Sequence, residues 1–454
     1  MNKRVKLYLG NNMDSIKKLP DNSIDSIVCD PPYAIKFMNR AWDYELPSVE
    51  FWREALRVLK PGGHLLAFGG TRTYHRLVCG IEDAGFEIRD QVMWIYGSGF
   101  PKSHNIGKAV DKINGVEIEK WPTIDMYNNS EIGNISKNQR CGVCEKPFSS
   151  GNPCKCDRRH KCDNEYEGWG TALKPANEPI CVARKPISEK TIAENVLKWG
   201  TGGINIDGCR IEIGGKDMED RISQEKSRRV DNNHNEGFLG KSKIEPNMKV
   251  SEGRFPANII FDETAAELLD EQSGISKPKK ERTGRKGGTN ESDFSKAISA
   301  DPDFIGHWPG DNGGGASRFF YCAKVSKAER NMGLDGFEDK ITPVNTGINS
   351  TDENGNKVRN DGSIIPPLVA KNTHCTVKPI TLMSYLIKLV TPVNGIILDP
   401  FMGSGSTGIA AQLNGFRFCG MEMSEEYFKI AEARIENYEL YRKFLDKRPK
   451  NPKK

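Results

Sequence analysis

The sequence lacks the long apolar runs that cross a bilayer, and it lacks the short apolar segment of a secretory signal. Hydrophobic residues make up only 37% of its 454 residues and aromatic residues only 8%, so a sizeable fraction of the chain is expected to be loop. The formal net charge is small, +5, and is compatible with phosphate contacts without requiring them. We therefore expect a cytoplasmic protein of two or three domains that does not contact membranes.

Cysteine, in contrast, is not scarce. In a chain without export signals, the 12 cysteines are expected to be thiols or metal ligands rather than disulfides. One cluster lies in a turn-rich stretch with little apolar material, where a metal would supply missing stability. Four thiolates satisfy tetrahedral zinc, which predicts a structural zinc site, with free thiols as the alternative. The predicted ligands are Cys141, Cys144, Cys154 and Cys156, with Cys162 or His160 as substitutes.

The most informative motif follows the apolar run Ile24–Cys29, which predicts a buried strand. Asp30-Pro31-Pro32-Tyr33 then falls on the loop at the strand's carboxyl end, where open α/β sheets bind ligands. The prolines remove backbone donors, so the Asp30 carboxylate and the Pro31 carbonyl become fixed acceptors beside an aromatic ring. This arrangement suits a planar amine, such as that of a nucleobase swung out of its stack, although a stiffened turn is the alternative.

A second motif lies near the other end of the chain. A short strand pattern, Ile396 to Leu398, leads into the glycine-rich stretch from Asp399 to Gly408 and then into a helical pattern. Its glycines satisfy G-x-G-x-x-G, a weak sign of nucleotide binding, and Glu422 follows the next strand pattern, placed to accept hydrogen bonds from ribose. A nicotinamide-dependent oxidoreductase would share these features, but the second half of a dinucleotide domain is missing downstream.

The missing half is found at the beginning of the chain. Joining the C-terminal unit ahead of it predicts one doubly wound α/β sheet in permuted order, with the Asp30 loop and the glycine loop side by side at its carboxyl edge. The expected strands are 5–9, 24–29, 64–68 and 88–96, and the expected helices are 14–19, 51–59 and 73–84.

These motifs together resemble the beta class of S-adenosylmethionine-dependent DNA amino-methyltransferases, in which D-P-P-Y precedes F-x-G-x-G. The resemblance covers roughly the first 100 residues, the last 80 before a basic tail, and a strand pattern around residues 172–183. The segment 374–379 also resembles the family's H-P-T-x-K-P, with Cys375 in place of proline. The resemblance implies a permuted Rossmann-like fold that binds S-adenosylmethionine. The cofactor-binding residues would be Asn11, Asp30, Thr376, Lys378, Asp399, Phe401, Gly403, Ser404, Gly405, Thr407 and Glu422.

The resemblance also implies an activity. We expect site-specific methylation of the 6-amino group of adenine in double-stranded DNA, by base flipping and direct attack, because aspartate at the first motif position is more typical of adenine enzymes in the family. Asp30, Pro31, Pro32 and Tyr33 would hold the base, with Tyr33 stacking on it. Cytosine 4-amino methylation is the main alternative. RNA or protein methylation, an oxidoreductase and a non-catalytic zinc DNA-binding protein are more distant ones. A homodimer and a cognate restriction enzyme are left open.

The resemblance divides the chain into six parts. Of the expected target-recognition region, 187–370, the pieces 200–210, 254–262 and 318–327 look ordered. The parts are a catalytic half, 1–100; an insertion with the cysteine-rich module, 101–168; a returning strand, 169–186; the target-recognition region, 187–370; a cofactor-binding half, 371–440; and a basic tail, 441–454.

Overall fold

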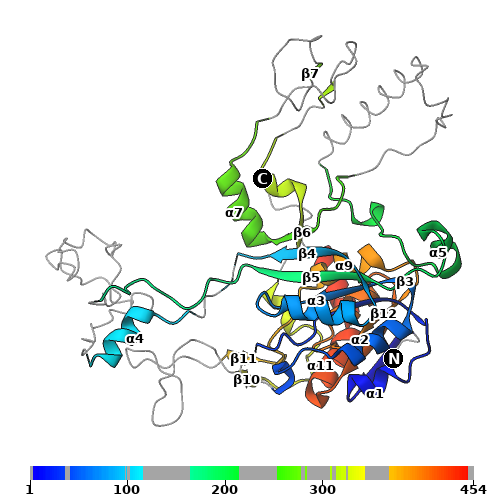
Figure 1. Ribbon diagram of the computed structural model, residues 1–454, viewed down its shortest axis with the longest axis horizontal. Coiled ribbons are helices and arrows are strands. Elements are labelled where there is room, and N and C mark those ends of the chain that lie inside the picture. Colours follow the sequence, from blue (N-terminus) through cyan, green and yellow to red (C-terminus); the bar gives the residue numbers. More distant parts are fainter. Residues whose placement is uncertain are drawn as a thin grey trace. The chain divides into compact units, whose positions relative to one another are not determined.

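The computed structural model describes residues 4–35, 41–97, 99, 103–115, 164–213, 253–277, 282–283, 307–308, 313–323, 326–342 and 368–447. The chain divides into two compact units, and Figure 1 labels helices and strands of both. The first comprises residues 1–98, 176–337 and 371–454, and the second comprises 99–175 and 338–370. Among the described residues, no helix is both long and apolar enough to cross a membrane.

A nine-stranded sheet organises the first unit, in the order β1-β13-β12-β2-β3-β5-β4-β6-β9. All neighbouring strands are parallel except β5, which runs antiparallel to both β3 and β4. The strands are β1 Val5–Leu9, β2 Ile24–Cys29, β3 Leu59–Phe68, β4 Glu87–Ile95, β5 Asn177–Arg184, β6 Ile259–Asp262, β9 Tyr321–Ala323, β12 Ile396–Asp399 and β13 Arg417–Glu422. A separate antiparallel pair joins β7 Arg282–Thr283 to β8 His307–Trp308.

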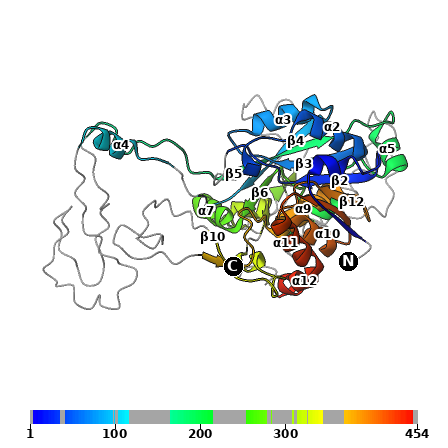
Figure 2. The same cartoon turned by 90° about the horizontal axis from the view of Figure 1, so that it is seen from below.

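Helices cover both faces of this sheet, and Figure 2 shows the two layers. Because successive side chains of a strand point to opposite faces, Ile27 packs with the α1–α3 layer and its neighbour Val28 packs with the α9–α11 layer. The first layer is α1 Asn12–Ile16, α2 Val49–Val58 and α3 Tyr74–Asp83; the second is α9 Ile380–Val390, α10 Ser406–Leu413 and α11 Glu425–Glu436. Further helices are α5 Ile192–Trp199, α7 Glu263–Ser273 and α12 Tyr438–Asp446, with 3-10 turns η2 Ala41–Asp43, η4 Asp207–Cys209, η5 Ala316–Phe319 and η6 Lys327–Arg330.

The expected neighbourhood of the two motif-bearing strands is confirmed. β12 pairs with β2 in parallel, with Leu398 opposite Ile27, so both strands end at the same edge of the sheet. The bounds of β1 and β2 agree with those predicted, whereas β3 begins at Leu59 rather than at His64. The earlier start arises because Leu59 already pairs with Ile24 of β2, and Gly62 and Gly63 pair with the backbone of Lys185.

Two expected divisions of the chain differ from the structure. Residues 187–370 were set apart from the catalytic sheet, but β6 and β9 extend that sheet beyond β4. The basic tail was expected from residue 441, but α12 continues to Asp446. The helix is anchored by Tyr441, whose ring is buried and whose hydroxyl donates to the Met332 carbonyl at 2.7 Å. Tyr438, Tyr441 and Phe444 recur every third residue, so this helix has an apolar face that the sequence analysis did not find.

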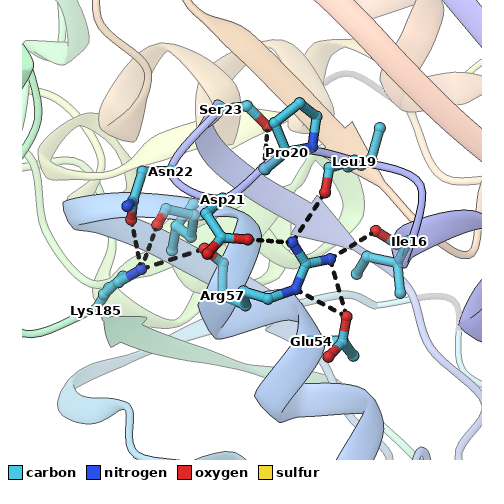
Figure 3. A network of polar contacts seen from close by, with 10 residues as sticks. Ile16, Leu19, Pro20, Asp21, Asn22, Ser23, Glu54, Arg57 and Lys185 are labelled. Atoms are coloured by element: carbon cyan, nitrogen blue, oxygen red, sulfur yellow. Dashed lines mark hydrogen bonds and ion pairs between the residues drawn. The ribbon is translucent and has the colours of Figure 1, made fainter.

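An arginine network at the amino end of β2 joins α1 and α2 to the sheet (Figure 3). Arg57 donates to the carbonyls of Ile16 (3.1 Å), the last residue of α1, and of Leu19 (2.9 Å), in the turn that follows. It also pairs with Asp21 and Glu54. The guanidinium therefore fixes the turn that leads from α1 into β2, at the edge opposite the two sequence motifs.

The second unit contains α4 Ile106–Ile113 and the segment 164–171 that packs beside it. Asn164 donates its side-chain amide to the Gly107 carbonyl (3.0 Å) and the Asp111 carboxylate (2.5 Å). The same unit holds the antiparallel pair β10 Lys340–Thr342 and β11 Leu368–Ala370. The four predicted zinc ligands, Cys141, Cys144, Cys154 and Cys156, lie outside the described residues, among which no cluster of three or more metal-ligating side chains is found.

Candidate active site

The loop after β2 places Asp30 at the carboxyl end of a strand in which every residue is buried. The buried Asp43 carboxylate fixes the loop by accepting the backbone N–H groups of Tyr33 (2.7 Å), Ala34 (3.0 Å) and Ile35 (3.3 Å). Thr73 adds a hydrogen bond from its hydroxyl to the Tyr33 carbonyl at 2.6 Å. Because Asp43 lies beyond the motif in a 3-10 turn, the sequence analysis did not find its role.

Four polar side chains from three parts of the sequence meet at this loop. The Lys378 ammonium lies 2.5 Å from Asp30 Oδ2 and 3.3 Å from Glu178 Oε2. The Tyr33 hydroxyl lies 2.7 Å from Asp30 Oδ1 and 3.0 Å from Glu178 Oε2, so its single proton can serve only one carboxylate at a time. We call Asp30, Tyr33, Glu178 and Lys378 the carboxylate cluster.

Burial and neighbouring charges shift the pKa values of Lys378 and Tyr33 in this cluster. Burial alone lowers the pKa of Lys378, but the negative charges of Asp30 and Glu178 outweigh that effect and raise it above its ordinary value. Burial, followed by the same two charges, raises the pKa of Tyr33 well above its ordinary range. At neutral pH the lysine is therefore charged and the tyrosine neutral.

The glycine loop after β12 lies at the same edge of the sheet. Asp399 Oδ1 accepts the Phe401 N–H (3.1 Å), and Asp399 Oδ2 accepts the Thr407 hydroxyl (2.5 Å), which ties the strand end to the start of α10. Burial raises the pKa of Asp399 to about 7. Gly405 adopts φ +81°, and a Cβ there would lie 3.1 Å from the Ala431 backbone, so this position requires glycine.

Two neighbouring segments shape the glycine loop. Glu422, at the end of β13, accepts the Gly403 N–H at 2.9 Å and the Ser424 N–H at 2.8 Å. The buried ring of His374 lies against Gly403, where a Cβ would be 2.7 Å from His374 Nε2. Burial lowers the pKa of His374 to about 4, so the ring is neutral at physiological pH.

A buried arginine holds the glycine loop in place by hydrogen bonds. Arg434 of α11 donates to the carbonyl and hydroxyl of Ser404, the latter at 2.8 Å, and to the Tyr441 hydroxyl of α12 at 2.9 Å. It also reaches the Glu329 carbonyl at 3.3 Å. Ser404 stays a predicted cofactor-binding residue, and in the structure its hydroxyl accepts a hydrogen bond from Arg434. The sequence did not indicate this role of Arg434, because it is one charged residue within an ordinary helical pattern.

Other residues predicted from the sequence take varied positions. Phe401 packs with Phe51 and Trp52 in the core, at ring-centroid distances of 5.2 Å and 6.4 Å. Asn11 is exposed and caps α1 by accepting the Met13 N–H, while its neighbour Asn12 donates to the Pro400 carbonyl at 3.2 Å. The Thr376 N–H donates to His374 Nδ1 at 3.3 Å.

Residues 24–433 match the family model described as DNA methylase, of the N6/N4 methyltransferases. The chain belongs to this DNA methylase family. The match includes both sequence motifs and every member of the carboxylate cluster.

Similarity of the chain to individual relatives is local. It is 46% identical over 63 residues to the Type II methyltransferase M2.DpnII of Streptococcus pneumoniae, covering 14% of the chain and 24% of that protein. It is 41% identical over 68 residues to the Type II methyltransferase M2.LlaDCHI of Lactococcus lactis subsp. cremoris, covering 15% and 25%. The matched segments span about a quarter of the length of these relatives.

Solved structures give a distant likeness. The M1.HpyAVI–SAM complex is 14% identical, with a TM-score of 0.35 over 95% of this chain and 99% of that one. The cytosine-N4-specific PvuII DNA methyltransferase is 12% identical, with a TM-score of 0.39 over 98% and 94%.

Proposed function

We propose that this DNA methylase transfers the methyl group of S-adenosylmethionine to an exocyclic amino group of a base in duplex DNA, with the 6-amino group of adenine as the preferred acceptor. The observation that supports this most is the meeting of two loops at one sheet edge. The Asp30 loop after β2 offers fixed acceptors, and the neighbouring β12 carries the glycine loop. Membership in the family agrees with this reaction.

The residues around the glycine loop fit a nucleoside cofactor. The Glu422 carboxylate stands at the end of β13, where an acidic side chain can accept hydrogen bonds from ribose hydroxyls, and its oxygens retain lone pairs beyond the two N–H groups that they accept. Glycine at positions 403 and 405 lets the loop pack closely against the His374 ring and the Ala431 backbone, which fixes its path. When bound, the cofactor supplies an electrophilic methyl group on a sulfonium.

The catalytic contribution of the chain is orientation and electrostatics. The amine of a base is planar because its lone pair is delocalised into the ring. Hydrogen bonds from its two N–H groups to the Asp30 carboxylate and the Pro31 carbonyl would favour a pyramidal nitrogen with its lone pair directed at the methyl group. Each carboxylate oxygen of Asp30 has a further lone pair beyond its contact with Tyr33 or Lys378, so it can accept an amine hydrogen as well.

Asp30→Ala tests the acceptor role. Lys378 keeps Glu178 as an ion-pair partner in this variant, so we expect a folded protein that still binds S-adenosylmethionine. Its methyl transfer should fall on the order of a hundredfold or more, since an oriented charged acceptor is lost. The assay is tritium transfer from the labelled cofactor to genomic DNA of a host without DNA methylation. Asp83→Ala, at the exposed end of α3, is the matched control. Near-normal turnover of Asp30→Ala would refute the proposed mechanism.

The same reaction products identify the base. Nucleoside mass spectrometry of the treated DNA should show N6-methyladenine. Label found only in N4-methylcytosine would make the adenine assignment wrong and would leave the transfer reaction standing, because both amines present two hydrogens to the same acceptors.

A further inference from the structure

The carboxylate cluster contains more negative than positive charge. Two carboxylates, Asp30 and Glu178, face the single ammonium of Lys378. Tyr33 adds a neutral hydroxyl, so the formal charges of the four side chains sum to one negative charge. The side chains are largely shielded from solvent, with exposed fractions of 9% for Lys378, 19% for Asp30 and 22% for Glu178. A charge at such a position is screened much less by salt than one on the open surface.

Glu178 is the source of the surplus charge. Lys378 lies closer to Asp30, at 2.5 Å, than to Glu178, at 3.3 Å, so its ammonium mainly compensates Asp30. Glu178 belongs to β5, opposite Trp94 of β4, and lies outside both sequence motifs. The raised pKa of Lys378 keeps this one compensating charge in place across the physiological pH range.

Resting on the proposed function, we propose that Glu178 shifts the site's preference toward the positively charged cofactor and away from its neutral product. Methyl transfer forms the N–C bond as the S–C bond breaks, and the sulfur keeps the electron pair of the broken bond as a neutral thioether, S-adenosylhomocysteine. The positive charge passes to the acceptor nitrogen, which then loses one of its two protons to solvent. An anionic cluster beside the acceptor attracts the sulfonium but not the thioether. Glu178 is thus a specificity-determining residue that eases exchange of spent cofactor for fresh cofactor.

Glu178→Gln separates this charge effect from a structural effect. Glutamine has nearly the same shape and keeps a carbonyl acceptor for Tyr33 or Lys378, but it has no charge. Dissociation constants of S-adenosylmethionine and of S-adenosylhomocysteine are measured by calorimetry without DNA. We expect the ratio of the product's constant to the cofactor's constant to fall about tenfold, chiefly through weaker binding of the sulfonium, the order expected when one charge is removed from a partly buried site.

Matched variants complete the experiment. Glu87→Gln makes the same replacement on β4, at the end of the β4–β5 ladder away from Glu178, where Glu87 pairs with Arg184 at 2.6 Å. In this control the ratio of the two dissociation constants should stay unchanged. Glu178→Asp retains the charge and should retain the ratio. If Glu178→Gln fails to fold, Glu178→Ala removes the same charge and should give the same fall.

The outcomes distinguish the two proposals. Wild-type protein that binds neither ligand would refute the proposed function itself. Wild-type protein that binds both, combined with equal weakening of both ligands or an unchanged ratio in Glu178→Gln, would refute the role of Glu178 and leave the methyltransferase proposal standing.

Discussion

Lys378 shows how one side chain can connect distant parts of the sequence. The resemblance of segment 374–379 to a family motif placed it near the cofactor, but the structure directs its ammonium to Asp30 and Glu178. The ammonium also lies 4.9 Å from the centre of the Phe68 ring. The motif did not indicate these two partners, because Glu178 is a single acidic residue at the start of a strand whose centre is apolar.

Another buried residue, His64 of β3, makes stability depend on pH. Burial, assisted by the positive charges of Arg184 and Arg89, lowers its pKa from 6.5 to about 4. Between these values the unfolded chain binds more protons than the folded one. The stabilisation is therefore complete above pH 6.5 and is lost as the pH falls toward 4.

We expect this one histidine to cost about 2 kcal/mol of unfolding free energy between pH 7 and pH 5. Urea unfolding of the wild type and of His64→Leu at both pH values measures the difference. The variant should lose about that much less on acidification, because its other titrating groups, His374 among them, are unchanged. Equal losses in the two proteins would show that His64 does not titrate in this way.

Among the elements, α1 and α2 depend on the arginine network at the amino end of β2. Arg57 donates to the carbonyls of Ile16 and Leu19 while it pairs with Asp21 and Glu54. Arg57→Gln should lower the unfolding free energy by about 1–3 kcal/mol, since hydrogen bonds to a charged donor are lost.

Chemical denaturation checks this expectation, with Arg53→Gln as the control on the same helix. The Arg53 side chain is 58% exposed and contacts Glu50 at 3.7 Å, so its replacement should change stability by less than about 0.5 kcal/mol. Similar effects of the two replacements would contradict the assigned role of Arg57.

The sequence predicted elements that are encoded by a pattern within their own segment. It did not predict the pairing of elements that depend on contacts with distant segments. β2 was predicted to the residue because a largely apolar run ends directly at a proline-rich turn, and the structure buries all six of its residues. β6 and β9 were recognised as ordered stretches but not as strands of the main sheet, because each is short and pairs with a segment far away in the sequence. The role of Asp43 was not predicted, because its contacts depend on the path of the loop around it.

For the whole molecule, the strand order makes the two ends of the sequence interdependent. β13 and β12 lie between β1 and β2 in the sheet. Residues 1–98 alone therefore lack the two strands that join β1 to β2. A fragment of residues 1–342 should show no cooperative thermal transition by circular dichroism, and addition of a second fragment, 368–454, should restore one. A cooperative transition of 1–342 alone, close in temperature to that of the full chain, would contradict this.

Strand order also has a consequence for biosynthesis. At about 10 residues per second, a ribosome produces Asp30 on the order of half a minute before Asp399. During that interval β2 has no β12 to pair with, and its backbone donors and acceptors on that side stay open to other strands. Chaperone demand should therefore peak while the middle of the chain is being translated and fall once β12 and β13 emerge from the exit tunnel.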